Sequence, residues 1–597
     1  MWPQAQPRLG KRKFVPWLCP HARLGARDRI PEPPPMSLGH RLPRAALALT
    51  LLLGPASAVR AQGTVSAGAE LPPPPPAAPA AQEIEAQKDT PPKPAVDVDQ
   101  AYSQALSERL LKQDGKPSAR QREDRAALVM FYGERQNAPV WTSSTGLTTA
   151  GQAVVAELGR AEDWGLDAAA FKIKSADVRG AFASPADQAA AEFEIAELVL
   201  KYARHAHGGR ADPTSISRFI DRQLTFVEPQ RVLAEISTAD APDAYLRKLH
   251  PQHPQFELLR QKYLALKRGE KLAVVTPPVE KEPVGKAKDA DKSEAPKPEK
   301  ASLKKLLVNM EQWRWMPDDL GDTFIWVNVP EFTLRVVKDG KVIHTERAIV
   351  GKTDKQTPIF SEGMAQVIFN PTWGVPDSIK KNEILPNLAK GRMRILARHN
   401  LKLVQNGKEV DPESVDWSTA DIRRYNVIQP SGGENVLGVV KFRFPNKHDV
   451  YMHDTPTKKL FNATERAFSH GCIRVREPEK FAELILAQDQ GWTGARVAAA
   501  IKSAQENQTV NLKRKIPVHL TYFTAAVGED GKLKLFKDVY GHEPRIAMGM
   551  EGKAHLLPKE KDPGPIEVGA VGSLAESSKK SVIGPKEEWA RKALGLN

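Results

Sequence analysis

Two proline-rich segments divide this chain, and they limit what can fold as one unit. Residues 62–98 are rich in Pro and Ala and contain LPPPPPAAPA at Leu71–Ala80, while residues 271–302 mix Pro with Lys and Glu. Proline lacks a backbone N–H and favours extended polyproline conformations, so both segments are expected to be disordered linkers. A chain of 597 residues is also too long for a single core. We therefore expect two folded domains, at 99–270 and 303–545.

The N-terminus has the pattern of a secretory signal peptide. After Met36, Arg41 and Arg44 precede a short apolar run, Ala45–Gly54, and small residues suited to cleavage follow. The run is far shorter than the roughly 20 residues that span a bilayer. We expect residues 1–61 to be an N-terminal extension plus signal peptide, with Met36 as the true start. The mature chain would then lie in the periplasm without a transmembrane span; an uncleaved amphipathic anchor is the alternative.

The charge balance favours an acidic partner without identifying one. The formal net charge is +15, and 27% of the residues are charged. Such a balance suits nucleic acid, an anionic membrane surface or an acidic polymer. No zinc-finger spacing, aromatic-glycine RNA-binding signature or basic heptad region is present, so we expect no nucleic-acid partner. Of the 87 Lys and Arg residues, 17 fall in the two linkers and in residues 546–597, a predicted disordered tail, where we expect them to serve solubility.

The first domain reads as helical. Within Ala189–Gly209 the apolar residues recur at helical spacing, and Gly208 and Gly209 supply a stop. The expected buried face consists of Phe193, Ala196, Leu200 and Ala203. His205 and His207 are two residues apart, so a helix would point them in different directions, and we expect them to be structural.

The second domain changes to the period of a β-strand. Apolar residues alternate through 323–337, and Lys338–Lys341 (KDGK) suits a hairpin turn. A later strand, Asp449–His453, would present its histidine at the strand end. The stretch after Val475 reads as a helix, with Pro478 in its first turn and Gly491 at its end. The fold class we expect is therefore a multidomain α+β protein: a mostly-β domain, a helical domain and linkers.

One thiol stands out as the candidate nucleophile. Apart from Cys19, in the N-terminal extension, the only cysteine is Cys472, which is preceded by His470 and Gly471. A lone thiol in an oxidising compartment has no internal disulfide partner. Cys472 also lies before a helix-forming stretch, where backbone N–H groups and a nearby imidazolium favour the thiolate. With His453 at a strand end upstream, the residues suggest a cysteine–histidine pair for acyl transfer.

Other chemistry at this place stays open. Gly471 allows a tight turn, so the N–H groups of Gly471 and Cys472 are candidates for binding a carbonyl oxyanion. Zinc is the main competing reading, with His453, Asp454, His470 and Cys472 as its ligands. A disulfide between Cys472 and a cysteine of another chain is a further alternative. We expect neither a metal nor a cofactor.

These residues resemble a known family. SHGCIRV at Ser469–Val475, with MHDTP upstream, is similar to the motif of the L,D-transpeptidase catalytic domain of the YkuD type. MEQWRWMP, VGKTDKQTPIF and NPTWGVP agree with its large periplasmic subgroup, and the resemblance covers about 303–545. The region 99–270 resembles the helical scaffold domain of that subgroup, through YGERQNAPVW and GLDAAAF. The subgroup's small peptidoglycan-binding module is not recognisable.

The resemblance implies a peptidoglycan transpeptidase. Cys472 would attack the bond between diaminopimelate and D-Ala in a tetrapeptide stem and form a thioester. A diaminopimelate amine of a neighbouring stem would then attack and leave a 3→3 crosslink. His453 would be the general base, and Ser469, His470 and Gly471 would shape the pocket and the oxyanion site. Carbapenems would acylate the same cysteine.

Further positions follow from the same resemblance. Arg474 stands where small members have Asn; it would bind a stem carboxylate, with a structural salt bridge as an equal alternative. Asp454 follows the histidine in place of the usual Gly and leaves open what orients the imidazole. Tyr451 and Trp373 match aromatic positions of the pocket, with core packing as their alternative. Residues 377–448 resemble a lid inserted over the site.

Three functions remain in competition. The first is crosslinking, with peptidoglycan stem peptides as substrates and other cell-wall enzymes as additional partners. The second is the same chemistry with another acceptor, as in an L,D-carboxypeptidase or an enzyme that attaches a protein to peptidoglycan. The third is a non-catalytic wall-binding scaffold with an inert thiol.

Overall fold

The computed structural model describes residues 99–112, 115–174, 180–275, 300–558 and 560. All of them belong to one compact unit of the chain, Pro91–Asn597. The signal peptide, the first linker and most of the second linker and tail lie outside the described residues. Where the chain is described, no helix is both long enough and apolar enough to cross a membrane.

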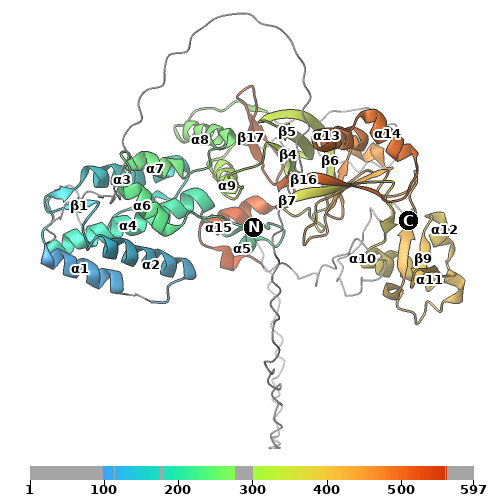
Figure 1. Cartoon of the computed structure of the whole chain (residues 1–597), viewed down its shortest axis with the longest axis horizontal. Helices are drawn as coiled ribbons and strands as arrows, with labels where there is room; N and C mark the ends of the chain where they lie inside the picture. Colours follow the sequence, from blue (N-terminus) through green and yellow to red (C-terminus); the bar gives the residue numbers. More distant parts are fainter. Residues whose placement is uncertain (1–98, 113–114, 175–179, 276–299, 559, 561–597) are drawn as a thin grey trace, which may run out of the picture. The chain divides into compact units, whose positions relative to one another are not determined.

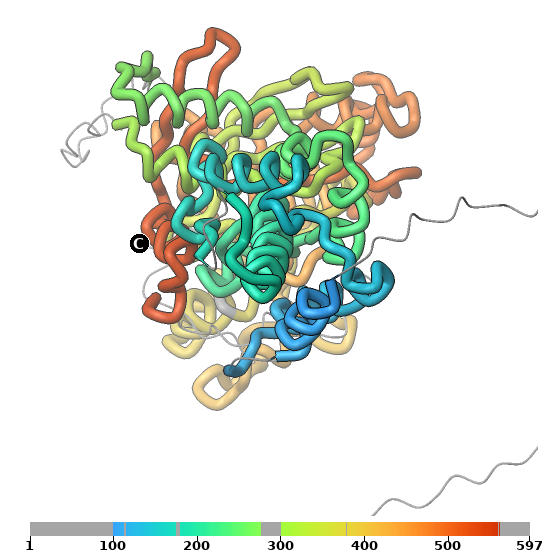
Figure 2. Tube along the Cα trace, turned by 90° about the vertical axis from the view of Figure 1, so that its left-hand side faces the viewer, coloured from blue at the N-terminus to red at the C-terminus, as the bar shows by residue number. Residues whose placement is uncertain are grey.

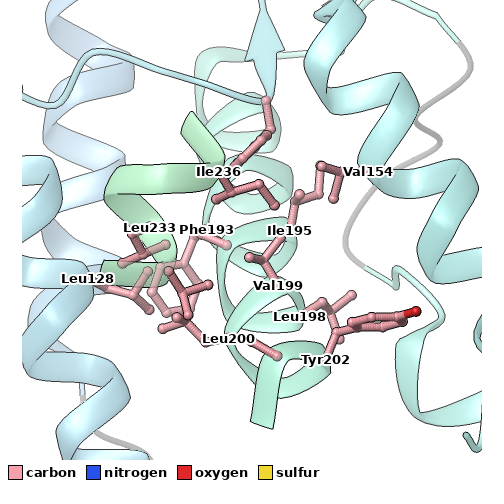
Figure 3. Packing of buried hydrophobic residues seen from close by; sticks show 14 of the residues in the cluster. Leu128, Val154, Phe193, Ile195, Leu198, Val199, Leu200, Tyr202, Leu233 and Ile236 are labelled. Carbon is pink, nitrogen blue, oxygen red and sulfur yellow. The ribbon is translucent and has the colours of Figure 1, made fainter. Parts of the chain in front are cut away.

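The first folded region is helical, as the sequence predicts. Its longest helix, α4 (Pro185–Gly208), contributes Phe193, Val199 and other apolar side chains to a core shared with its neighbours (Figure 3). The same helices form the blue to green coils of Figure 2. The other helices are α1 Gln100–Leu111, α2 Ala119–Glu134, α3 Thr149–Gly159, α5 Pro213–Ile216, α6 Pro229–Ser237, α7 Pro242–Lys248 and α8 Pro254–Lys267, and the short strands β1 Thr142–Ser143 and β2 Gly146–Leu147 pair with each other.

Local sequence explains where α4 begins and ends. The Ser184 hydroxyl accepts a hydrogen bond from the backbone of the first turn, and Pro185 starts the helix, where its missing N–H costs nothing. Gly209 ends the helix with a φ of 83°, a conformation that glycine tolerates best. All four residues of the expected buried face are buried, so the predicted face is confirmed.

A nine-stranded sheet forms the second region. Its order is β14-β6-β15-β13-β12-β7-β16-β4-β5. Strands β4, β5, β6, β7 and β16 of this sheet are labelled in Figure 1. The strands are β4 Thr323–Asn328, β5 Thr333–Lys338, β6 Lys341–Gly351, β7 Ser361–Phe369, β12 Val440–Arg443, β13 Met452–His453, β14 Ala467–Ser469, β15 Ile473–Val475 and β16 Gln508–Thr521. Together with the helical region, this sheet makes the chain a multidomain α+β protein, as expected.

The alternating pattern places the core. Ile325 and Val327 of β4, and Leu334 and Val336 of β5, are fully buried on one face. The turn between β5 and β6 has left-handed Asp339 and Gly340, as a two-residue hairpin requires. Long strand β6 pairs with β5 over its first part and with β15 near its end, so it closes the sheet on itself.

Two helices cover this core. Helix α13 (Pro478–Gln490) begins at the predicted proline and ends at Gly491, which is left-handed. Its Phe481 ring packs 4.5 Å, between centroids, from Phe442 of β12. Helix α14 (Gly494–Lys502) packs against α13 and adds Val497 to the same cluster.

A separate small core lies in the segment predicted to be a lid. The segment leaves the sheet after Phe369 of β7 and returns at Val440 of β12, and these two residues are register partners. The predicted limits, 377–448, therefore include strand β12 of the main sheet. The inserted elements are β8 Trp373–Gly374, α10 Asp377–Ile379, α11 Leu385–Leu388, α12 Arg394–Arg398, β9 Lys402–Gln405, β10 Lys408–Glu409 and β11 Asn426–Gln429.

Ordered structure extends beyond two predicted boundaries. Strand β3 (Val274–Val275), in the predicted second linker, pairs with β18 (Leu533–Leu535), which forms a hairpin with β17 (Ala525–Val527). Helix α15 (His542–Met550) crosses the predicted start of the tail at 546, and its Ile546 is fully buried. Helix α9 (Leu303–Trp313) packs against α8. This contact joins the helical region to the sheet region.

Candidate active site

Strands β13 and β15 bring the predicted nucleophile and base onto one face of the sheet. They run parallel, with His453 as the register partner of Arg474. Side chains alternate along a strand, and Cys472 lies two residues before Arg474, so it shares the face of His453. Met452 and Ile473 point the other way into the core. The parallel pairing thus explains why a strand end and a later turn meet.

The turn that carries Cys472 is fixed by its own side chains. The Ser469 hydroxyl donates to the carbonyl of Cys472 at 2.5 Å and accepts the N–H of Gly471 at 3.1 Å. Gly471 has a φ of 115°, which strongly favours glycine. The Gly471 N–H is therefore occupied, contrary to its predicted role in oxyanion binding. Among the hydrogen bonds of the described residues, none is donated by the N–H of Cys472, which stays a candidate.

A series of buried hydrogen bonds holds this turn in place. The Thr357 hydroxyl donates to the Gly471 carbonyl at 2.8 Å and accepts the N–H of Gly351 at 2.9 Å. The Tyr540 phenol accepts the Thr357 N–H and donates to the Gly351 carbonyl at 2.7 Å. All these polar groups are buried, where an unpaired group would be costly, so the series holds the turn in one position.

A backbone carbonyl orients His453. Its Nδ1 lies 2.5 Å from the carbonyl oxygen of Asp454. A carbonyl can only accept, so Nδ1 carries the proton and Nε2 of the neutral ring has a free lone pair. Burial, with the nearby Arg474 guanidinium, lowers the pKa of His453 to about 3. The ring is therefore a neutral base at physiological pH.

The Asp454 carboxylate has a structural task. It accepts the N–H of Val439 at 3.0 Å, the N–H of Thr455 at 2.6 Å and the Lys458 ammonium at 2.5 Å. Gly438 packs so closely against this carboxylate that an added Cβ would lie 2.1 Å from it. These contacts fix the backbone beside His453. They place the carboxylate among protein donors, which weakens the predicted substrate-binding role.

Cys472 lies in a half-buried place that disfavours charge. Burial, partly offset by hydrogen bonds from Tyr451, raises the pKa of its thiol to about 11. The sequence suggested a preformed thiolate beside an imidazolium. The structure instead holds a neutral thiol and a neutral imidazole, because the low-dielectric surroundings penalise both charges. Proton transfer must then accompany attack.

Tyr451 and Lys441 lie beside Cys472 and His453 on the same face of the sheet. The Tyr451 ring meets the His453 ring edge to face, with centroids 5.7 Å apart. The Lys441 ammonium lies 3.8 Å from the centre of the Tyr451 ring, and Lys441 is the register partner of His453. Sequence reasoning missed Lys441. The alternation Val440, Lys441, Phe442 carried the signal, since it places a cation opposite the apolar face.

Two predicted substrate-binding residues are largely enclosed. Arg474 is 3% exposed and donates to the Thr457 hydroxyl at 3.3 Å. Trp373 is buried in the core of the inserted segment, against which Tyr451 also packs. The position of Trp373 favours core packing, its alternative, whereas Arg474 stays a candidate for either predicted role. His470 lies half-buried in the turn itself, between Ser469 and Gly471.

The donor set does not form a metal site. Within the described ranges, no three His, Cys, Asp or Glu side chains come together as metal ligands. The carbonyl-bound Nδ1 of His453 and the ion pair of Asp454 instead tie both residues to protein partners.

Two family models match this chain. Residues 322–498 match the model described as the L,D-transpeptidase catalytic domain, and residues 126–262 match the one described as the Scaffold domain. The chain carries an L,D-transpeptidase catalytic domain. Cys472, His453, Tyr451 and Lys441 all lie within the matched range of this domain. Tyr540 lies beyond it.

Known proteins agree with the L,D-transpeptidase assignment. A curated relative from Haemophilus influenzae, "Putative L,D-transpeptidase", is 32% identical over 243 residues, which are 40% of this chain and 48% of the relative. The chain thus spans about half the length of that relative.

Solved structures similar to this chain include two L,D-transpeptidases. The one from Mycobacterium smegmatis is 13% identical with a TM-score of 0.16, and covers 34% of this chain and 58% of that chain. L,D-transpeptidase 1 from Mycobacterium tuberculosis is 15% identical with a TM-score of 0.15. The match covers 34% of this chain and 61% of that chain. Scores this low carry no weight for the fold.

Proposed function

We propose that this chain is a peptidoglycan L,D-transpeptidase of the periplasm. Its donor is the tetrapeptide stem, cut between diaminopimelate and D-Ala, and its product is a 3→3 crosslink. The arrangement that carries the proposal is the pair on one sheet face: a Cys472 thiol, and a His453 ring whose Nδ1–H is held by the Asp454 carbonyl. The matched catalytic domain supports the substrate class.

The first half-reaction forms a thioester. His453 Nε2 takes the Cys472 proton as the sulfur attacks the diaminopimelate carbonyl carbon. The resulting oxyanion needs a donor, and the N–H of Cys472 is the candidate in the turn. The tetrahedral intermediate collapses, the C–N bond breaks, and the imidazolium returns its proton to the leaving D-Ala amine.

In the second half-reaction, an amine attacks the thioester. A side-chain amine of diaminopimelate on a neighbouring stem attacks the same carbonyl carbon while His453 takes its proton. The C–S bond breaks, and the proton returns to sulfur. The energy of the original amide is retained in the thioester, so no nucleotide is needed. Keeping water out favours crosslinking over hydrolysis, and the inserted segment at Trp373–Leu437 is the candidate cover.

Stem-peptide analysis tests this proposal. Purified protein is incubated with disaccharide-tetrapeptides, and the products are separated and weighed by mass spectrometry. We expect crosslinked dimers and released D-Ala, and loss of both in Cys472→Ala. Lys513→Ala, a change at an exposed position of β16, is the matched control and should keep full activity. A carbapenem should add its mass to the wild type and leave Cys472→Ala unmodified.

Other outcomes separate the competing functions. Tripeptides without dimers would indicate an L,D-carboxypeptidase, and a protein lysine joined to a stem would indicate attachment of a protein. Crosslinking that survives in Cys472→Ala would remove this residue as the nucleophile. Unchanged stems, together with no carbapenem adduct, would leave a wall-binding scaffold. Osmotic-shock fractionation of cells tests the periplasmic location.

A further inference from the structure

A cationic cavity lies in the helical region, away from the sheet that carries Cys472. It has a volume of about 450 Å³ and is lined by Lys116 and Pro117, by residues of α2, by residues of the stretch 170–174 and by residues of α4. Seven of its lining residues are Lys or Arg, and three are Asp or Glu. This volume falls in the range of known ligand sites, roughly 300–1,000 Å³.

Most of these cations lack an acidic partner. Arg125 pairs with Glu197 at 3.2 Å, and Arg204 pairs with Asp124. The other five lining cations form no ion pair with any carboxylate of the described residues; they are Lys116, Arg122, Lys172, Lys174 and Lys201. The cavity therefore has a surplus of positive charge that the protein itself does not neutralise.

Lys201 is a partly buried cation in the wall of the cavity. Its ammonium is half-buried, and it donates to the carbonyl of Ala170 at 3.0 Å. Burial and the neighbouring Arg204 guanidinium lower the pKa of Lys201. Two like charges held together at a partly desolvated place cost free energy, and a bound anion would offset this cost.

We propose that this cavity binds the carboxylates of a peptidoglycan stem peptide, as a second substrate site outside the catalytic domain. The proposal rests on the function proposed above, which supplies a polymer with several carboxylates per repeat. Leu198 and Pro117 offer apolar contact for the aliphatic parts of such a stem. Binding here would hold a glycan strand on the helical region, a task for which no separate module is recognisable in the sequence.

Calorimetric titration tests the site with a defined probe. Disaccharide-tetrapeptide is titrated into the Cys472→Ala protein, which cannot turn it over, at 50 and 300 mM salt. We expect two binding phases, of which one weakens at least tenfold at the higher salt because it depends on charge. Lys201→Glu and, at an exposed place, Lys172→Glu should each remove that phase. Lys513→Glu is the charge-matched control and should keep it.

The following results decide whether the cavity binds a stem peptide. A salt-dependent phase that survives both cavity variants would overturn the proposal. So would inorganic phosphate that binds the cavity as tightly as the muropeptide, since this would indicate only a general anion site. Carbapenem acylation, measured in variants that retain Cys472, should be unchanged by Lys172→Glu. If acylation fails everywhere but the phase persists, the proposed function fails while the cavity still binds a stem.

Discussion

At the scale of single residues, burial decides how the nucleophile works. The same desolvation that raises the pKa of Cys472 to about 11 lowers that of His453 to about 3. Each shift disfavours the charged form, so the resting pair is neutral and exchanges its proton only while sulfur attacks. Such a thiol is protected from premature reaction yet has a base aimed by the Asp454 carbonyl.

This pair predicts a flat pH profile for acylation. His453 stays deprotonated above about pH 4, and Cys472 stays protonated below about pH 10, so neither changes state between pH 5 and 9. The second-order rate of carbapenem acylation should vary less than about threefold over this range, since only a change of protonation state would alter it. Stopped-flow measurement checks this. A rise that follows a single ionisation near pH 8 would instead indicate an ordinary free thiol.

Lys441 should assist the developing charge on sulfur. Its ammonium lies on the Tyr451 ring, and its charge lowers the pKa of Cys472 against the effect of burial. Lys441→Met keeps the stem and removes the charge; we expect acylation about tenfold slower, which corresponds to roughly 1.4 kcal/mol in the barrier. Lys513→Met is the control. An unchanged acylation rate with unchanged melting temperature would show that Lys441 only packs.

At this scale the sequence predicts candidate residues but not their environment. Cys472 and His453 could be proposed from sequence because few residue types carry out acyl transfer. Lys441 and the paired state of Gly471 N–H depend on strand register and on a side chain two positions away, which spacing alone does not reveal. For Trp373 and Arg474 the sequence left two alternatives each, since it does not show whether an aromatic or a cationic side chain is enclosed or exposed; the structure encloses both.

At the scale of elements, the catalytic turn depends on segments far from it in sequence. Thr357 follows β6, and Tyr540 precedes α15, and together they fix the Gly471 carbonyl. Tyr522, in the segment after β16, extends this series of hydrogen bonds. Its hydroxyl accepts the Tyr540 N–H at 2.6 Å and donates to the Asp538 carboxylate at 2.7 Å. The segment after β18 is thus part of the support of the site.

Thr357→Val should separate positioning from folding. Valine has nearly the same shape but cannot donate to Gly471 or accept from Gly351. We expect a stability loss of about 1–2 kcal/mol and a kcat reduced about tenfold with little change in KM, since only the turn is displaced. Thr357→Ser should restore most of kcat. Equal losses in both variants would mean that the methyl group, not the hydroxyl, matters.

Elements with a strong local signal were predictable, and those defined by distant pairing were not. The turn at Asp339 and Gly340 and the ends of α13 at Pro478 and Gly491 follow from local chemistry. Strand β3 is two residues long and exists because β18 pairs with it. Helix α15 has no strong periodic pattern; its place comes from burial of Ile546 against the helical region.

At the scale of the whole molecule, buried histidines make folding depend on pH. Burial lowers the pKa of His205, His453 and His542 to about 3, and that of His253 and His519 to about 4. Burial also lowers the pKa of His250, which is stacked on Trp164, well below its usual value. Six histidines thus remain neutral in the fold but bind protons near pH 6.5 once unfolded. Three carboxyls with raised pKa, those of Glu192, Glu197 and Asp449, act in the opposite direction.

The net effect should be a loss of stability in mild acid. Near pH 5 each of these histidines binds a proton in the unfolded chain but not in the fold, so each lowers the free energy of unfolding by about 1.4 kcal/mol per pH unit as pH falls, and the three carboxyls offset part of this loss. The histidine contribution is fully present above pH 6.5 and is lost as pH falls through the folded pKa values of about 4 and about 3. Urea unfolding at pH 7, 6 and 5 measures it. His542→Phe, which keeps a buried ring, should reduce the slope by about 1.4 kcal/mol per pH unit, whereas exposed His555→Gln should not. Equal stability at pH 7 and 5 would contradict the burial of these rings.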